Sequence, residues 1–170
     1  SFHNKSELNE LLMLINKEKQ NINTKIPIAL KISPDIEEKN ISEISELILK
    51  HKLELLIISN TTEKNRENLK NINKLEKGGL SGKPLETKSN LLINKFYRNL
   101  KNKIKIIGVG GLDTGAGAYE KIINGATLVQ LYTGMVYKGP DIAYKICNEL
   151  SDILKQKGVK NISEIIGIKN

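Results

Sequence analysis

The chain has 170 residues, 39% hydrophobic and 27% charged, a balance that excludes a disordered or fibrous protein and allows one domain with a sizeable core. No apolar run approaches the roughly 18–20 residues of a membrane helix, no signal-peptide pattern is present, and one cysteine and two histidines disfavour a disulfide framework or a metal site. The formal charge of +8 leaves a nucleic-acid-binding protein open, but the lysines are dispersed and lack interleaved aromatic residues, which disfavours that class.

Hydrophobic periodicity predicts helices and strands that alternate along the chain. The first helix spans 6–20 with Ser6 as its N-cap, and a buried strand spans 26–32. Asp35 and Glu38 resemble a capping box, which would start the second helix near Ile36. The later elements are a strand at 53–59, a helix near 87–100, a strand at 103–111, a helix near 115–124, a strand at 126–132 and a helix at 140–157.

One helix followed by four strand–helix repeats predicts a parallel sheet covered by helices, with right-handed crossovers. An open doubly wound sheet and half of a (β/α)8 barrel both fit this order. The carboxyl end of every strand carries polar residues or glycines, namely Lys31 and Ser33, the SNTT run at 59–62, the GVGG run at 108–111, and the YTG run at 132–134. Four such ends on one rim favour the half-barrel, in which the last two strand ends would bind a phosphate group.

Single residues on this rim have both a structural and a functional interpretation. Lys31 lies inside an apolar strand, so it either meets an anion or reaches solvent from an edge strand, and its apolar neighbours favour burial and function. The GVGG run is either a tight turn or a phosphate cradle, and the SNTT run is either a cap or a binding group. We interpret His51 as a structural residue at a helix end and Cys147 as a small core residue.

Six segments together resemble the second half of dihydroorotate dehydrogenase, specifically its class 2, quinone-linked, FMN-dependent branch. The resemblance extends from about Ile26 to Pro140 and is carried, in order, by ALKISPD, IISNTT, GGLSGKPL, IIGVGG, GATLVQLYTG and KGP. It implies that residues 1–170 are the C-terminal half of one FMN-binding (β/α)8 barrel domain. The complete protein would oxidise dihydroorotate to orotate in pyrimidine biosynthesis, pass electrons from FMN to quinone, and lie peripherally on the cytoplasmic (inner) membrane.

The resemblance also implies roles for eight residues. Asn60 and Thr61 would bind the substrate ring, and Lys31 would lie beside the flavin ring. Ser59 would contact FMN at a position where many relatives carry threonine. The remaining cofactor contacts would come from Gly82, Gly111, Tyr132 and Thr133.

The resemblance places other parts of the enzyme upstream of the chain. The catalytic base of the class is a serine that we expect before the first helix, together with the N-terminal half of the barrel, so we expect no catalytic residue and no metal site here. Ser1 in place of a starting methionine agrees with a fragment of a longer protein. Two alternatives remain: a noncatalytic isolated half-barrel, the product of a degraded or split gene, or a basic nucleic-acid-binding α/β protein. As an isolated chain, we expect the half-barrel to self-associate through its uncovered sheet.

Overall fold

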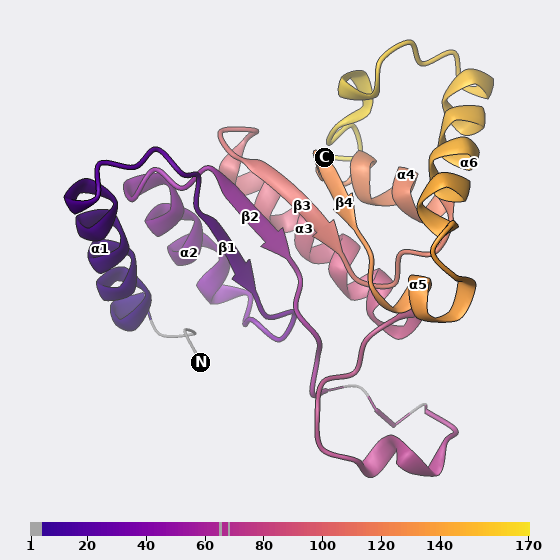
Figure 1. Cartoon of the computed structure of the whole chain (residues 1–170), viewed down its shortest axis with the longest axis horizontal. Coiled ribbons are helices and arrows are strands. Elements are labelled where there is room, and N and C mark those ends of the chain that lie inside the picture. Colours follow the sequence, from indigo (N-terminus) through magenta and orange to yellow (C-terminus); the bar gives the residue numbers. More distant parts are fainter. Residues whose placement is uncertain (1–4, 65, 68) are drawn as a thin grey trace.

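The computed structural model of the chain describes residues 5–64, 66–67 and 69–170 (Figure 1). Four short parallel strands alternate with helices, as predicted. The strands are β1 (Ala29–Ile32), β2 (Leu55–Ile58), β3 (Lys105–Val109) and β4 (Leu128–Gln130). The helices are α1 (Lys5–Asn21), α2 (Lys39–Lys50), α3 (Glu86–Leu100), α4 (Gly115–Ile123), α5 (Thr133–Lys138) and α6 (Ile142–Gln156), with short 3-10 turns η1 (Ile72–Leu75), η2 (Lys83–Leu85) and η3 (Ile162–Ile165).

The four strands form one sheet in the order β1-β2-β3-β4, so each strand pairs only with its neighbours in sequence. This order belongs to a singly wound sheet that curves toward closure, whereas a doubly wound sheet reverses its strand order at a switch point. The observed strands are shorter than predicted; the strand expected at 26–32, for example, begins at Ala29. The predicted half of a (β/α)8 barrel is therefore the observed architecture.

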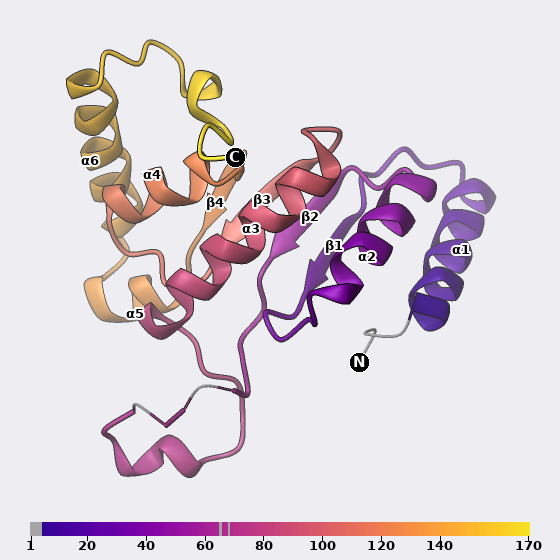
Figure 2. The same ribbon diagram turned by 180° about the vertical axis from the view of Figure 1, so that it is seen from behind.

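Among the residues that the structure describes, helices cover one face of the sheet and not the other; Figure 2 shows the sheet from the helix side. Side chains alternate between the faces, so Leu56 and Ile58 of β2 and Ile106 of β3 are buried against the helices. A cross-strand row points to the uncovered face, formed by Lys31, Ile57, Ile107 and Leu128. Lys31 is exposed there, so burial on both faces of its strand was a wrong prediction; β1 is an edge strand.

The main core lies between the sheet and helices α1, α2 and α3. Helix α3 shows how the sequence encodes it, because Leu92, Ile93, Phe96 and Leu100 recur at helical spacing and are all buried. Burying one such side chain stabilises the fold by about 1.5–3 kcal/mol. A second core joins α4 to α6 through Leu112, Ala118, Ile142 and Ile146. These two cores fix the helices behind the strand ends.

Two predicted helix starts are wrong. Ser6 lies inside α1, which already includes Lys5, so it is not an N-cap. Helix α2 begins at Lys39 with Glu38 at its N-cap position, and no side chain caps it. Asp35 does not cap that helix, because its carboxylate accepts hydrogen bonds from the segment that follows β2 instead. The sequence pattern was correct about a polar contact at Asp35 and wrong about its partner.

The carboxyl-terminal region also differs from expectation. The helix predicted at 140–157 spans Ile142–Gln156, and it is preceded by the short helix α5 that sequence periodicity did not indicate. Cys147 is exposed on α6, so its prediction as a core residue is wrong. His51 ends α2 as expected and contacts Asn16 and Asn9 of α1, whereas His3 lies outside the described residues. No helix in the described part of the chain is long and apolar enough to cross a membrane.

Candidate functional site

A pocket of about 730 Å³ opens at the carboxyl ends of the four strands. Its size falls within the range of small-molecule and cofactor sites. All eight residues that the sequence singled out line this pocket: Lys31, Ser59, Asn60, Thr61, Gly82, Gly111, Tyr132 and Thr133. The structure thus brings together residues that are up to 102 positions apart in the sequence, because parallel strands end at the same edge of the sheet.

The segment after β2 is held by backbone hydrogen bonds to both neighbouring strands. The Ser59 N–H donates to the carbonyl of Val109 at 3.0 Å, and the Asn60 N–H donates to the carbonyl of Ile32 at 2.8 Å. Ser59 is buried, whereas the side chains of Asn60 and Thr61 are exposed to the pocket. The Asn60 side-chain oxygen accepts the Thr61 N–H at 2.9 Å. This end of β2 therefore presents one amide and one hydroxyl side chain on a fixed backbone.

Two glycine-containing turns close the other side of the pocket. Gly82 and Gly111 both have positive φ, of 76° and 70°, a region that favours glycine. A Cβ on Gly111 would lie 2.5 Å from the Cβ of Glu86, so close packing against α3 already requires glycine there. A Cβ on Gly82 would contact Thr133, whose hydroxyl lies 2.9 Å from that of Ser81. The turns before α3 and after β4 are therefore packed against each other.

The remaining two predicted residues are both exposed. Tyr132 is 80% exposed at the end of β4, and Lys31 projects from the edge strand at the opposite side of the pocket. The described residues contain no cluster of acidic, histidine and cysteine side chains able to hold a metal ion. The pocket instead offers hydroxyl, amide and ammonium groups beside apolar walls such as Leu80, Leu112 and Leu131. This combination suits an organic ligand that carries anionic groups.

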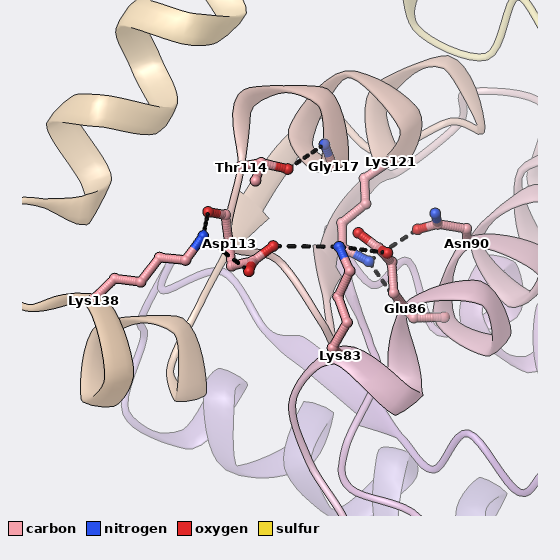
Figure 3. Close-up of polar contacts among 9 residues, drawn as sticks. Lys83, Glu86, Asn90, Asp113, Thr114, Gly117, Lys121 and Lys138 are labelled. Carbon is pink, nitrogen blue, oxygen red and sulfur yellow. Dashed lines mark hydrogen bonds and ion pairs between the residues drawn. The ribbon is translucent and has the colours of Figure 1, made fainter.

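Sequence reasoning missed a charged network on the rim, drawn in Figure 3. The carboxylate of Asp113 lies 3.3 Å from the ammonium of Lys83 and 3.0 Å from that of Lys138. Burial alone would raise the pKa of Asp113, but hydrogen bonds and charge from these two lysines outweigh it and lower that pKa. A hydrogen bond from Lys83 to Glu86 raises the pKa of Lys83. The network joins three segments around the pocket. It could not be predicted from the sequence because its members lie far apart along the chain.

Lys121 of α4 was also missed, and it is fully buried. Its ammonium lies 2.9 Å from the side-chain oxygen of Asn90 and 3.2 Å from the hydroxyl of Ser89 (Figure 3 labels Lys121 and Asn90). The Ser89 hydroxyl in turn donates a hydrogen bond at 2.5 Å to the carbonyl of Val109, the residue that precedes the glycine turn at 110–111. Burial lowers the pKa of Lys121 to about 8. A usable signal existed, because Lys121 lies on the same helical stripe as the buried Ala118 and Ile122.

The half-barrel and the pocket at its strand ends identify the chain as one part of a (β/α)8 barrel protein. A model of the family described as "Dihydroorotate dehydrogenase" matches residues 1–154. The chain therefore belongs to the dihydroorotate dehydrogenase family.

Curated relatives that match the chain include "Dihydroorotate dehydrogenase (quinone)" of Trichodesmium erythraeum, 40% identical over 100% of this chain and 46% of the relative. The protein of the same name from Psychromonas ingrahamii is 43% identical over 84% of this chain and 44% of the relative. The chain thus spans about half the length of the curated relatives it matches.

A solved structure titled as that of DHODH from Eimeria tenella in complex with ferulenol has a TM-score of 0.93 and 30% sequence identity to this chain. The superposition covers 98% of this chain and 49% of the Eimeria chain. The predicted fold class, the C-terminal half of a (β/α)8 barrel, and the predicted family are both confirmed by these matches.

Proposed function

We propose that the chain supplies the FMN-phosphate side and part of the orotate site of a quinone-linked dihydroorotate dehydrogenase. The complete protein would oxidise dihydroorotate to orotate and pass the electrons to quinone. The observation that carries this proposal is the convergence of all eight expected ligand residues on one pocket. Family membership and the name shared by the similar curated proteins support it.

The residues of the pocket fit FMN. The backbone of the turns at Gly82 and Gly111 lines the pocket, and Thr133 presents a hydroxyl beside them. Lys31 brings a cation to the opposite side of the same pocket. Gly82, Gly111, Tyr132 and Thr133 would hold the phosphate end, and Ser59 and Lys31 the ring end. Bound FMN would supply the two-electron acceptor for the oxidation.

The chain's own side chains would orient and stabilise the reactants. The ammonium of Lys31 would stabilise negative charge that develops on the ring system beside it, an electrostatic effect that grows where water is excluded. Asn60 and Thr61 would hydrogen-bond the polar ring of orotate, since an amide and a hydroxyl can each donate and accept. The proton of dihydroorotate would be removed by a serine in the complementary half, which would also cover the open sheet face.

The first test is a titration of the purified chain with FMN, followed by quenching of flavin fluorescence. Saturable one-to-one binding is the expected result for a preformed half-site. A well-folded chain that binds no FMN, alone or assembled with a complementary half, would contradict the proposal and favour a noncatalytic half-barrel. Turnover is tested in a hybrid in which this chain replaces the matched half of the Trichodesmium erythraeum relative.

Lys31→Met and Lys105→Met form a matched pair for kinetic measurements on the hybrid. Both lysines are exposed in strands, but Lys105 lies at the amino end of β3, away from the pocket. We expect Lys31→Met to slow reduction of the hybrid's flavin by at least about tenfold, about 1.4 kcal/mol of activation free energy, and Lys105→Met to leave it unchanged. Equal rates in the two variants would remove Lys31 from the site.

A further inference from the structure

The carboxylate of Asp35 joins three segments behind the pocket. It accepts a hydrogen bond from the Thr62 hydroxyl at 2.6 Å and one from the Glu63 N–H at 3.1 Å. It also forms an ion pair with Lys88 in the first turn of α3. The loop after β1, the loop after β2 and helix α3 are thereby connected through one side chain.

The contacts around Asp35 are largely removed from solvent. The Asp35 side chain is 15% exposed, that of Lys88 is 29% exposed, and Thr62 as a whole is 2% exposed. Thr62 is also paired in both directions with Leu80, through backbone hydrogen bonds of 3.1 and 2.7 Å. Although burial would raise the pKa of Asp35, hydrogen bonds from Lys88, Thr62 and Glu63 lower it, so the carboxylate is ionised at neutral pH. Charge-assisted hydrogen bonds of this kind are stronger than neutral ones.

Asn60 and Thr61 lie between two fixed points. On one side the Asn60 N–H is bonded to Ile32, and on the other Thr62 and Glu63 are bonded to Asp35. Their own side chains point into the pocket and make no contact with Asp35 that would compete with a ligand. Both ends of this short span are therefore held by other segments, the far end by Asp35 and by the bridge from Thr62 to Leu80.

We propose that Asp35 is a positioning residue that holds Asn60 and Thr61 in register for a polar heterocycle of the orotate type, an inference that rests on the proposed function. The phosphate side of the pocket depends on other contacts. Thr133 packs on Ser81 and Gly82, and Gly111 packs on Glu86. Loss of the Asp35 carboxylate should thus weaken orotate binding and leave FMN binding intact.

The test compares Asp35→Asn with Glu54→Gln, both in the FMN-loaded protein assembled with its complementary half. Glu54 is a matched control because it also accepts a backbone N–H, from Ile28 at 2.9 Å, and pairs with a lysine, Lys19 at 3.4 Å. It lies just before the amino end of β2, away from the pocket. Orotate is titrated against flavin absorbance, and FMN affinity is measured separately.

We expect Asp35→Asn to raise the orotate Kd by about tenfold or more, the effect of losing one charge-assisted hydrogen bond, with FMN affinity within about twofold of the parent. Glu54→Gln should leave both affinities unchanged. Amide hydrogen exchange at Thr62–Lys64 should speed up in Asp35→Asn alone. If that variant does not fold, Thr62→Val removes the donor and is judged by the same criteria.

Parental orotate affinity in folded Asp35→Asn or Thr62→Val would overturn the inference, and so would an equal loss of FMN and orotate binding. A parent protein that binds no orotate overturns the proposed function as well, and this outcome is recognised before any variant is made. A selective loss of orotate affinity, absent from Glu54→Gln, supports the positioning role because a general loss of stability would weaken both ligands.

Discussion

Lys121 is the residue whose replacement tests the interior electrostatics most directly. Its pKa falls from the ordinary 10.5 to about 8 because the ammonium is buried, which corresponds to a cost of about 3 kcal/mol for keeping the charge in the folded chain at neutral pH. Lys121→Met removes that cost but leaves Asn90 and Ser89 without their donor, a loss of about 1–3 kcal/mol. We therefore expect the variant to be about 0–2 kcal/mol more stable than the parent at pH 7.

The sign of the pH dependence is opposite to that of a stabilising ion pair. Below pH 8 Lys121 is charged in both states, so the parent bears the full cost. Between about pH 8 and 10.5 the folded chain loses the proton first, the unfolded chain binds more protons, and stability of the parent rises with pH. Lys121→Met lacks this increase. The free-energy difference between parent and variant should therefore shift by about 3 kcal/mol toward the parent across this window.

Urea unfolding at pH 7 and pH 10.5, at low micromolar protein, measures both effects. Lys145→Met is the control, because Lys145 is exposed and pairs with the exposed Asp141; its effect should stay within about 0.5 kcal/mol at both pH values. A parent-to-variant difference that does not change with pH would refute the depressed pKa. A loss of more than about 3 kcal/mol in Lys121→Met at pH 7 would show that the buried charge stabilises the fold.

Three further predictions concern packing and exposure. Gly111→Ala should lower the free energy of unfolding in urea by about 3 kcal/mol or more, because its Cβ would overlap Glu86. Gly158 has the same φ of 70° but lies in open space, so Gly158→Ala should lower it by only about 1 kcal/mol. Equal losses in the two variants would refute the packing argument. Cys147 is exposed, so a thiol reagent should modify it fully in the native chain, and protection until unfolding would contradict that placement. The uncovered sheet face exposes Leu128 to 57%, and β1 and β4 leave the sheet edges open. We therefore expect the isolated chain to self-associate, and a single monomeric species in sedimentation velocity would contradict this.

Local sequence signals predicted the elements and the site because both depend on short-range patterns. The runs around Ile58 and Ile106 are continuous and apolar, as parallel strands covered by helices require, and the residues just after them must share one edge. Residues such as Asn60 and Thr133 could therefore be assigned to one pocket without coordinates. The assignment of their ligands still rests on family resemblance.

The errors came from contacts that sequence spacing does not encode. Asp35 lies three positions before Glu38, which is the spacing of a capping box, but a tertiary contact with Thr62 took precedence. Cys147 lies on a helix, but its side of α6 is not the side that buries Ile142 and Ile146. Lys121 lies on the same helical stripe as Ala118 and Ile122, but a lysine in a short amphipathic helix is usually solvated. Its contacts with Ser89 and Asn90 of α3 account for its burial.

The described residues of the loop at 63–79 (63–64, 66–67 and 69–79) extend away from the barrel rim, and the antiparallel bridge between Thr62 and Leu80 joins the two ends of the loop (Figure 1). Because that bridge holds the two ends of the loop together, a change in the number of residues between them should not move the residues that line the pocket. Doubling the length of such a loop costs only about 0.6 kcal/mol in closure entropy. This loop is thus a suitable insertion site for a fluorescent or affinity module, which would report on the neighbouring rim without altering the strand ends that form it.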